Sequence, residues 1–218
     1  MKHAVLVISD IHLGSANCNA NALLRVLKTE TAQTLVINGD LFDSSRKHRL
    51  KKTHWKILGA IRKLSKRTKV ILINGNHDNK TDLHGILGFE THDEYVLAVS
   101  GIKFLFIHGD IFDFAIIQFP WCSSIIAELY YHACKNTWLR HHLNKWIHRT
   151  QSGVSLENAA VQYKKHKETN WICCGHTHFA KIDPLLGYLN SGTFTSTPPA
   201  YITIDFSGLP SIVVDDDS

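Results

Sequence analysis

Clusters of aspartate, asparagine and histidine follow five short apolar segments of this sequence, and no other feature constrains the fold as strongly. The apolar segments are rich in β-branched residues, which is typical of buried strands. Ligands bind in open α/β sheets at the carboxyl ends of strands, so clusters placed there can converge on one site. The five clusters are Ser9 to His12, Asn38 to Asp43, Asn74 to Asp78, His108 to Asp110 and Gly175 to His178.

The order of these segments along the chain predicts a layered α/β fold. Helical periodicity is expected near residues 23–27, 55–64 and 158–167. We interpret residues 1–218 as a single domain, with a helical cap inserted at about 113–167. The expected strands are residues 4–8, 35–37, 70–73, 95–99, 103–107, 171–174, 201–204 and 212–214.

The charge of the chain is concentrated in one stretch. Eleven of the 24 basic residues lie between Arg46 and Lys69, where there is no acidic residue, and the remainder of the chain has 13 basic against 19 acidic residues. This stretch indicates an anionic partner such as a phosphate, a nucleic acid or a membrane surface, or simply a solvated helix face. We expect that helix to bury Trp55, Leu58, Ile61 and Leu64.

Composition narrows the class of protein further. The chain has 218 residues, of which 44% are apolar and 20% charged, and this composition excludes a disordered protein. Its five cysteines have no disulfide or zinc-knuckle spacing, which fits a reducing compartment. The apolar run near the N-terminus is too short for a signal peptide, and no segment has the roughly 18 apolar residues of a membrane span. We therefore expect a cytoplasmic protein, with peripheral contact at the inner face of the membrane as an option.

The spacing inside the clusters favours a metal site. Asp10 and His12 are two residues apart, as are His176 and His178, so each pair projects to one side of an extended chain. Mixed carboxylate, amide and imidazole donors suit Mn²⁺, Fe or Zn²⁺ better than Mg²⁺ or Ca²⁺. Seven candidate ligands exceed the needs of one tetrahedral ion but would serve two ions that share a carboxylate. They are Asp10, His12, Asp40, Asn76, His108, His176 and His178.

In this order the clusters resemble the signature of the calcineurin-like metallophosphoesterase superfamily: Asp-x-His, Gly-Asp-x-x-Asp, Gly-Asn-His-Asp, a lone His and Gly-His-x-His. The resemblance covers residue 4 to about 192, apart from the helical block. It implies a two-layer β-sandwich flanked by helices, with two divalent ions, Mn²⁺ first and Fe or Zn²⁺ as alternatives, at one edge. One ion would take Asp10, His12 and His178, the other Asn76, His108 and His176, and Asp40 would bridge them.

The resemblance also implies hydrolysis of a phosphoester or pyrophosphate by metal-activated hydroxide. His77 would contact the phosphate and assist departure of the leaving group. Asp43 would pair with His77 and keep it protonated. Without the motif, His77 could be a surface-turn imidazole and Asp43 a helix N-cap. The other histidines, His54 among them, have no ligand-like context, and we expect most of them to be exposed.

Within the superfamily, residues 108–113 and 158–176 resemble the UDP-2,3-diacylglucosamine pyrophosphatases of lipid A synthesis, which give lipid X and UMP. This resemblance implies a lipid-linked nucleotide or another phosphorylated small molecule as substrate. The apolar residues at 114–126 would hold acyl chains or form the core of a helical hairpin, and the basic stretch could rest on anionic lipid.

Other functions use the same residues. A phosphoprotein phosphatase, or a nucleotide or nucleic-acid phosphodiesterase, would need the same metal centre and could grip phosphates with the basic stretch. A non-catalytic binding module is disfavoured because all seven ligands and His77 are present. The sequence predicts no particular oligomeric state.

Overall fold

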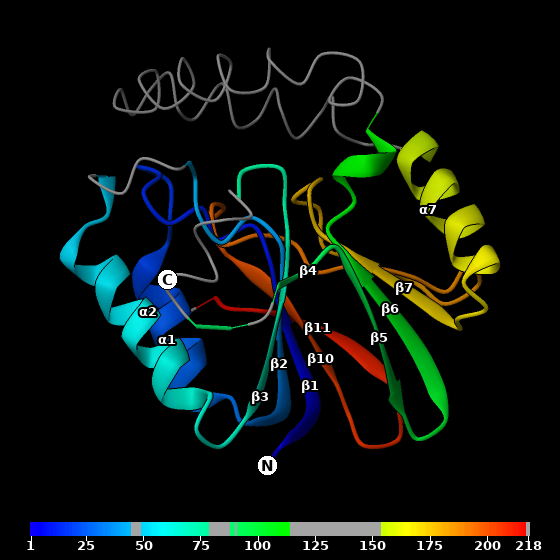
Figure 1. Ribbon diagram of the computed structural model, residues 1–218, viewed down its shortest axis with the longest axis horizontal. Helices are drawn as coiled ribbons and strands as arrows, with labels where there is room; N and C mark the ends of the chain where they lie inside the picture. The colour runs from blue at the N-terminus through cyan, green and yellow to red at the C-terminus, as the bar shows by residue number, and fades with distance from the viewer. Residues whose placement is uncertain (45–48, 79–87, 90, 114–153, 217–218) are drawn as a thin grey trace.

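Two β-sheets pack face to face, with helices on their outer faces (Figure 1). The structure, a computed structural model, describes residues 1–44, 49–78, 88–89, 91–113 and 154–216. This mixed α/β architecture confirms the predicted sandwich flanked by helices.

The first sheet has the strand order β11-β10-β1-β2-β3-β4. β1 pairs with β2 and β2 with β3 in parallel, whereas β10 runs antiparallel to both β1 and β11. The strands are β1 (His3–Ile8), β2 (Ala32–Asn38), β3 (Lys69–Ile73), β4 (Thr91–His92), β10 (Ala200–Ile204) and β11 (Pro210–Val214).

The second sheet has the order β5-β6-β7-β9-β8. β5 and β6, which correspond to the expected strands at 95–99 and 103–107, form an antiparallel hairpin, and β6, β7 and β9 pair in parallel. The strands are β5 (Glu94–Val99), β6 (Ile102–Ile107), β7 (Trp171–Cys174), β8 (Lys181–Asp183) and β9 (Tyr188–Asn190).

Apolar side chains fill three layers between these elements. The inner faces of the sheets meet in one core, where Val7 and Val36 lie with Phe104 and Phe106. The helices α1 (Ala20–Thr29) and α2 (Lys52–Leu64) cover the other face of the first sheet, and α7 (Val154–His166) covers the second sheet. Because both faces of each sheet are covered, the central strands are apolar throughout rather than alternating.

The five polar clusters begin where β1, β2, β3, β6 and β7 end. Parallel pairing within each sheet brings these ends to one edge, the upper edge of the sandwich in Figure 1. Asn38 joins the two sheets there, since its side-chain amide donates to the carbonyl oxygens of Ile107 (3.2 Å) and Cys173 (3.0 Å). The layered fold therefore positions all five clusters at a common edge.

The buried face of α2 differs from the prediction. The helix buries His54, Ile57, Leu58 and Ile61, whereas the side chain of Trp55 is 51% exposed. The buried positions follow the i, i+3, i+4, i+7 spacing of a helix face, and Trp55 lies outside it. The expectation that Trp55 is buried is wrong, but the lysines and arginines do lie on the outer face.

The predicted cap at about 113–167 lies mostly outside the described residues. Its C-terminal part is α7, where Ala160 and Val161 pack with Ile172 and Tyr188 of the second sheet. The apolar segment at 114–126 is not among the described residues, so its role stays a prediction. Within the described ranges, no helix has the length and apolarity of a membrane span.

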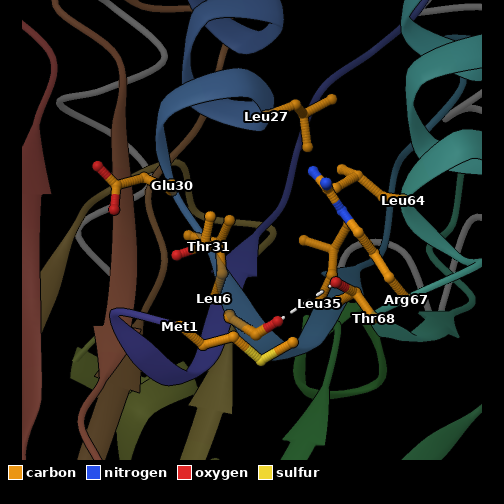
Figure 2. Close-up of a pocket in the computed structure, with 10 residues that line it drawn as sticks. Met1, Leu6, Leu27, Glu30, Thr31, Leu35, Leu64, Arg67 and Thr68 are labelled. Carbon is orange, nitrogen blue, oxygen red and sulfur yellow. Dashed lines mark hydrogen bonds between the residues drawn. The ribbon is translucent and has the colours of Figure 1, made fainter.

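A pocket of about 210 Å³ lies at the opposite end of the first sheet from the polar clusters (Figure 2). Its lining is dominated by leucines of β1, β2, α1 and α2, with Arg67 and Glu30 beside them. Arg67 belongs to the basic stretch, whose first described arginine, Arg49, instead contacts Asp43 at the polar edge (3.5 Å). The basic stretch thus runs from one end of the molecule to the other.

Candidate metal centre

The backbone at the polar edge adopts a conformation that side chains rarely tolerate. Seven non-glycine residues of the described chain have positive φ, and five of them are predicted ligands: Asp10 (50°), His12 (49°), Asp40 (51°), His176 (63°) and His178 (62°). Such strained positions persist where the surrounding structure enforces them, and they concentrate at functional sites. The backbone therefore marks the same residues as the motifs do.

Glycines allow the loops of the site to approach one another closely. A Cβ atom at Gly39 would overlap the imidazole of His108, and one at Gly75 would overlap the carboxylate of Asp40. At Gly175, it would lie 2.5 Å from Oδ2 of Asp10. Because none of these neighbours is a flexible side-chain end on the surface, only glycine leaves room for the ligand set to assemble.

Asp40 lies between imidazoles contributed by both sheets. Its Oδ2 is 3.5 Å from Nε2 of His12 and 3.4 Å from Nε2 of His108. Burial by itself would raise the pKa of Asp40, but His108, His77 and His12 hold that pKa well below its usual value. The carboxylate is thus ionised, as a bridge between two cations would require.

Asp10 lies beside Asp40 at the same edge of the sandwich. Its Oδ1 lies 3.0 Å from Nε2 of His178 and 4.0 Å from Nε2 of His12, and its carboxylate is fully buried. Burial opposes ionisation, yet His178 and His108 lower the pKa of Asp10 to about 2. Asp10, His12 and His178 form a group of potential ligand atoms within 4.8 Å of one another, which is the first predicted ligand set.

The second predicted ligand set is assembled less completely. Asp10, Asp40 and His108 form another group within 4.8 Å, whereas His176 is not part of such a group of histidine, cysteine and acidic residues in the described chain. The rings of His108 and His176 are nevertheless 5.3 Å apart. Asn76 belongs to the loop whose next residue, His77, donates its backbone N–H to Asp40 Oδ1 (2.9 Å).

Several buried atoms at this edge have no hydrogen bond, although buried polar atoms are normally paired. They include Asp10 Oδ1, His12 Nε2, Asn76 Oδ1 and His108 Nε2, from the three loops that follow β1, β3 and β6. These are the donor atoms that a divalent cation would use, and mixed nitrogen and oxygen donors suit Mn²⁺, Fe or Zn²⁺. The residues therefore fit the predicted metal ions.

The second nitrogen of each of these imidazoles contacts a protein group. His108 Nδ1 bonds the Asn38 carbonyl oxygen (3.0 Å), and His12 Nδ1 lies 3.6 Å from Asp43 Oδ1. A protein acceptor at Nδ1 fixes the proton there and leaves a lone pair on Nε2 for a metal. In His178, Nδ1 lies 3.5 Å from Thr195 Oγ1, a hydroxyl that can donate or accept, while Nε2 faces Asp10.

The contact between His77 and Asp43 is not the one expected. The Nδ1 of His77 bonds the backbone carbonyl oxygen of Asp43 (2.8 Å), while the Asp43 carboxylate faces His12 and Arg49. The hydrogen bond between the two residues is therefore to the backbone, although Asp43, His12 and His77 each offer a potential ligand atom within 4.8 Å of the others. Burial lowers the pKa of His77, but Asp40 and the bond to Asp43 outweigh it and raise that pKa.

Three supporting features were not predicted. Asp78 accepts backbone N–H groups of Phe42 (3.0 Å) and Gly75 (3.1 Å), which joins the loops after β2 and β3. Asn190 donates to the Gly175 carbonyl oxygen (2.7 Å), and Thr193 donates to that of Asp10 (2.9 Å). Asn190 and Thr193 belong to none of the sequence motifs, and only the tertiary structure reveals their role.

His54 belongs to the group of histidines of which most were expected to be exposed, but it is only 2% exposed. Its Nδ1 accepts the backbone N–H groups of Gly14 and Lys51, both at 3.2 Å. It thereby fixes the start of α2 against the loop that carries His12. Burial and the charge of Lys51 lower the pKa of His54.

Comparison with known proteins agrees with this geometry. A family model described as calcineurin-like phosphoesterase matches residues 3–180. No curated protein sequence gives a significant match.

Solved structures share the fold at low sequence identity. The phosphoesterase YfcE of E. coli is 18% identical with a TM-score of 0.52, covering 98% of each chain. An archaeal phosphodiesterase is 16% identical with a TM-score of 0.52, covering 98% of this chain and 99% of its own. Vps29 of Entamoeba histolytica, complexed with Zn²⁺, is 15% identical with a TM-score of 0.51, covering 96% of this chain and 98% of its own.

Proposed function

The chain belongs to the calcineurin-like phosphoesterase family, and from that membership we propose that its metal centre holds two divalent ions and hydrolyses a phosphodiester or pyrophosphate bond. The observation that carries the proposal is the set of buried, unbonded donor atoms on Asp10, His12, Asn76 and His108. Metal-dependent hydrolysis of phosphate esters is the activity of the family, and the number of ions and the residue roles are our proposal.

The proposed ligands divide between the two sheets. Asp10, His12 and His178 would hold one ion, and Asn76, His108 and His176 the other, with Asp40 shared. Bound there, the ions would polarise the phosphoryl group, lower the pKa of a water molecule and orient an in-line displacement. The protein contributes the ionised carboxylates of Asp10 and Asp40, and the ring of His108 is already fixed by its bond to the Asn38 carbonyl oxygen before any ion binds.

His77 is the proposed acid for the leaving group. Its Nδ1 is committed to the Asp43 carbonyl, so a second proton, on Nε2, is the one that the ring can transfer. His77 is partly exposed, whereas Asp10 and Asp40 are buried, so a substrate can reach the imidazole from solvent. The ring lies 4.9 Å from that of His12, next to the proposed metal ligands.

Among substrates, we place UDP-2,3-diacylglucosamine first. The sequence pattern at 108–113 and 158–176 supports this choice. Ile111 (47% exposed) and Phe179 (61% exposed) add support, because they present apolar side chains within a few residues of His108 and His178. The second candidate is a nucleotide or nucleic-acid phosphodiester, which the basic outer face of α2 favours.

A substrate panel with Mn²⁺ separates these candidates. It comprises UDP-2,3-diacylglucosamine, bis-p-nitrophenyl phosphate, a phosphopeptide and single-stranded DNA, each with wild-type protein and with Asp40→Ala as the inactive control. We expect wild-type turnover of the diester and the highest kcat/KM for the lipid-linked nucleotide. Preference for the phosphopeptide or the DNA would overturn the lipid substrate, and turnover of none of the four would overturn the phosphoesterase itself.

A further inference from the structure

Asp113 lies against a predicted metal ligand although no part of the family signature includes it. Its Oδ2 is 3.0 Å from Nε2 of His176, whose side chain is almost completely buried. Asp113 comes directly after a short 3-10 helix, η2 (Asp110–Phe112), and its backbone N–H donates to the Asp110 carbonyl (3.0 Å). The carboxylate is therefore held by a turn next to the ligand His108.

The position of that turn is fixed by the helix beside it. The ring of Phe112 packs edge-on against Tyr163 of α7, with the ring centres 5.5 Å apart. The Tyr163 hydroxyl in turn donates to Glu94 on β5 (2.7 Å). These contacts tie η2 to the body of the second sheet, so Asp113 approaches His176 from a fixed direction.

His176 differs from the other proposed imidazole ligands in the carboxylate that faces its Nε2. The carboxylates nearest Nε2 of His12, His108 and His178 belong to Asp10 and Asp40, which are themselves proposed metal ligands. The carboxylate that faces Nε2 of His176 belongs to Asp113, which is not a proposed ligand. An imidazole nitrogen that bonds such a carboxylate carries the proton, so the other nitrogen, Nδ1, keeps its lone pair.

We propose that Asp113 is a positioning residue that accepts the Nε2–H of His176 and presents Nδ1 of that ring to the second metal ion. The proposal rests on the proposed metal centre and goes beyond it, because it assigns a residue and a ring nitrogen that the motifs leave open. Carboxylates in this position orient the imidazole and increase its basicity, and their loss typically weakens metal binding about 10–100-fold.

Calorimetric titration of chelator-stripped, full-length protein with Mn²⁺ tests this role. Wild type should bind two ions, and Asp113→Ala should bind one as before and the other about 10–100-fold more weakly. Asp113→Asn should retain most of the affinity, since its amide oxygen can still accept from Nε2–H. Glu168→Gln, which removes an exposed charge beyond the end of α7, is the control and should match wild type.

Three results would overturn the inference. Two sites of wild-type affinity in Asp113→Ala would show that Asp113 does not support metal binding. Equal losses in the Asn and Ala variants would mean that Asp113 is itself a ligand. Absence of Mn²⁺ binding by wild type would instead overturn the proposed metal centre, and this inference with it.

Nitrogen NMR of the Zn²⁺-loaded wild type provides a readout that needs no variant to fold. Two-bond ¹H–¹⁵N correlations should show His176 with its proton on Nε2 and the metal on Nδ1. The same experiment should show the opposite arrangement for His108, whose Nδ1 bonds the Asn38 carbonyl. A proton on Nδ1 of His176 would overturn the inference.

Discussion

His77 is the proposed acid for a poor leaving group, because it is a partly exposed imidazole beside buried carboxylates. We expect His77→Ala to retain its metal ions but to hydrolyse an alkyl phosphodiester about 10²–10⁴-fold more slowly, the usual cost of losing a general acid. The loss should be much smaller for p-nitrophenyl esters, whose leaving group needs no proton. Steady-state kinetics with both esters check this, with His166→Ala, an exposed histidine of α7, as the control. Equal kcat for wild type and His77→Ala on the alkyl ester would rule out this role.

His54 links the helix α2 to the loop that carries His12, and this link should depend on pH. Its pKa is lowered in the folded protein by burial and Lys51, so the folded state binds fewer protons than the unfolded state below about pH 6.5. The contribution of His54 to stability is therefore complete above that pH and decreases as the pH falls through the folded-state pKa. The loss for one such group cannot exceed about 1.4 kcal/mol per pH unit.

Urea unfolding of the metal-free protein at pH 7 and pH 5 measures this effect. His54→Asn keeps an acceptor near the position of Nδ1 but does not titrate. We expect the free energy of unfolding to decrease more from pH 7 to pH 5 in wild type than in His54→Asn. Parallel decreases in the two proteins would contradict a titrating His54.

Elements with long apolar runs were predictable, and short ones were not. The strand at residues 171–174 was predicted with the bounds that β7 has, because Trp171 to Cys174 is an apolar run between Asn170 and Gly175. β4 and β8 have two and three residues, too few to show a period.

The seven candidate ligands could be found because each belongs to a local motif. Asp113 and Asn190 could not, because their roles arise from contacts with His176 and Gly175 that only the folded chain creates.

At the scale of the whole molecule, the site joins two sheets that each hold half of it. Asp10, Asp40 and Asn76 follow strands of the first sheet, and His108, His176 and His178 follow strands of the second. Within the described residues, Asn38 links the two sheets directly, because its side-chain amide donates to the carbonyl oxygens of Ile107 and Cys173. Metal ions bound at this edge would connect the sheets and favour the folded state over the unfolded one.

Titration of Mn²⁺ into chelator-stripped protein, with hydrolysis of bis-p-nitrophenyl phosphate followed at each addition, tests the central claim most directly. We predict no turnover without metal, and a rate that rises to its maximum near two ions per chain. Asp40→Ala should bind less metal and remain inactive throughout. Full turnover by the chelated wild-type protein, or by metal-poor Asp40→Ala, would contradict a dinuclear phosphoesterase centre.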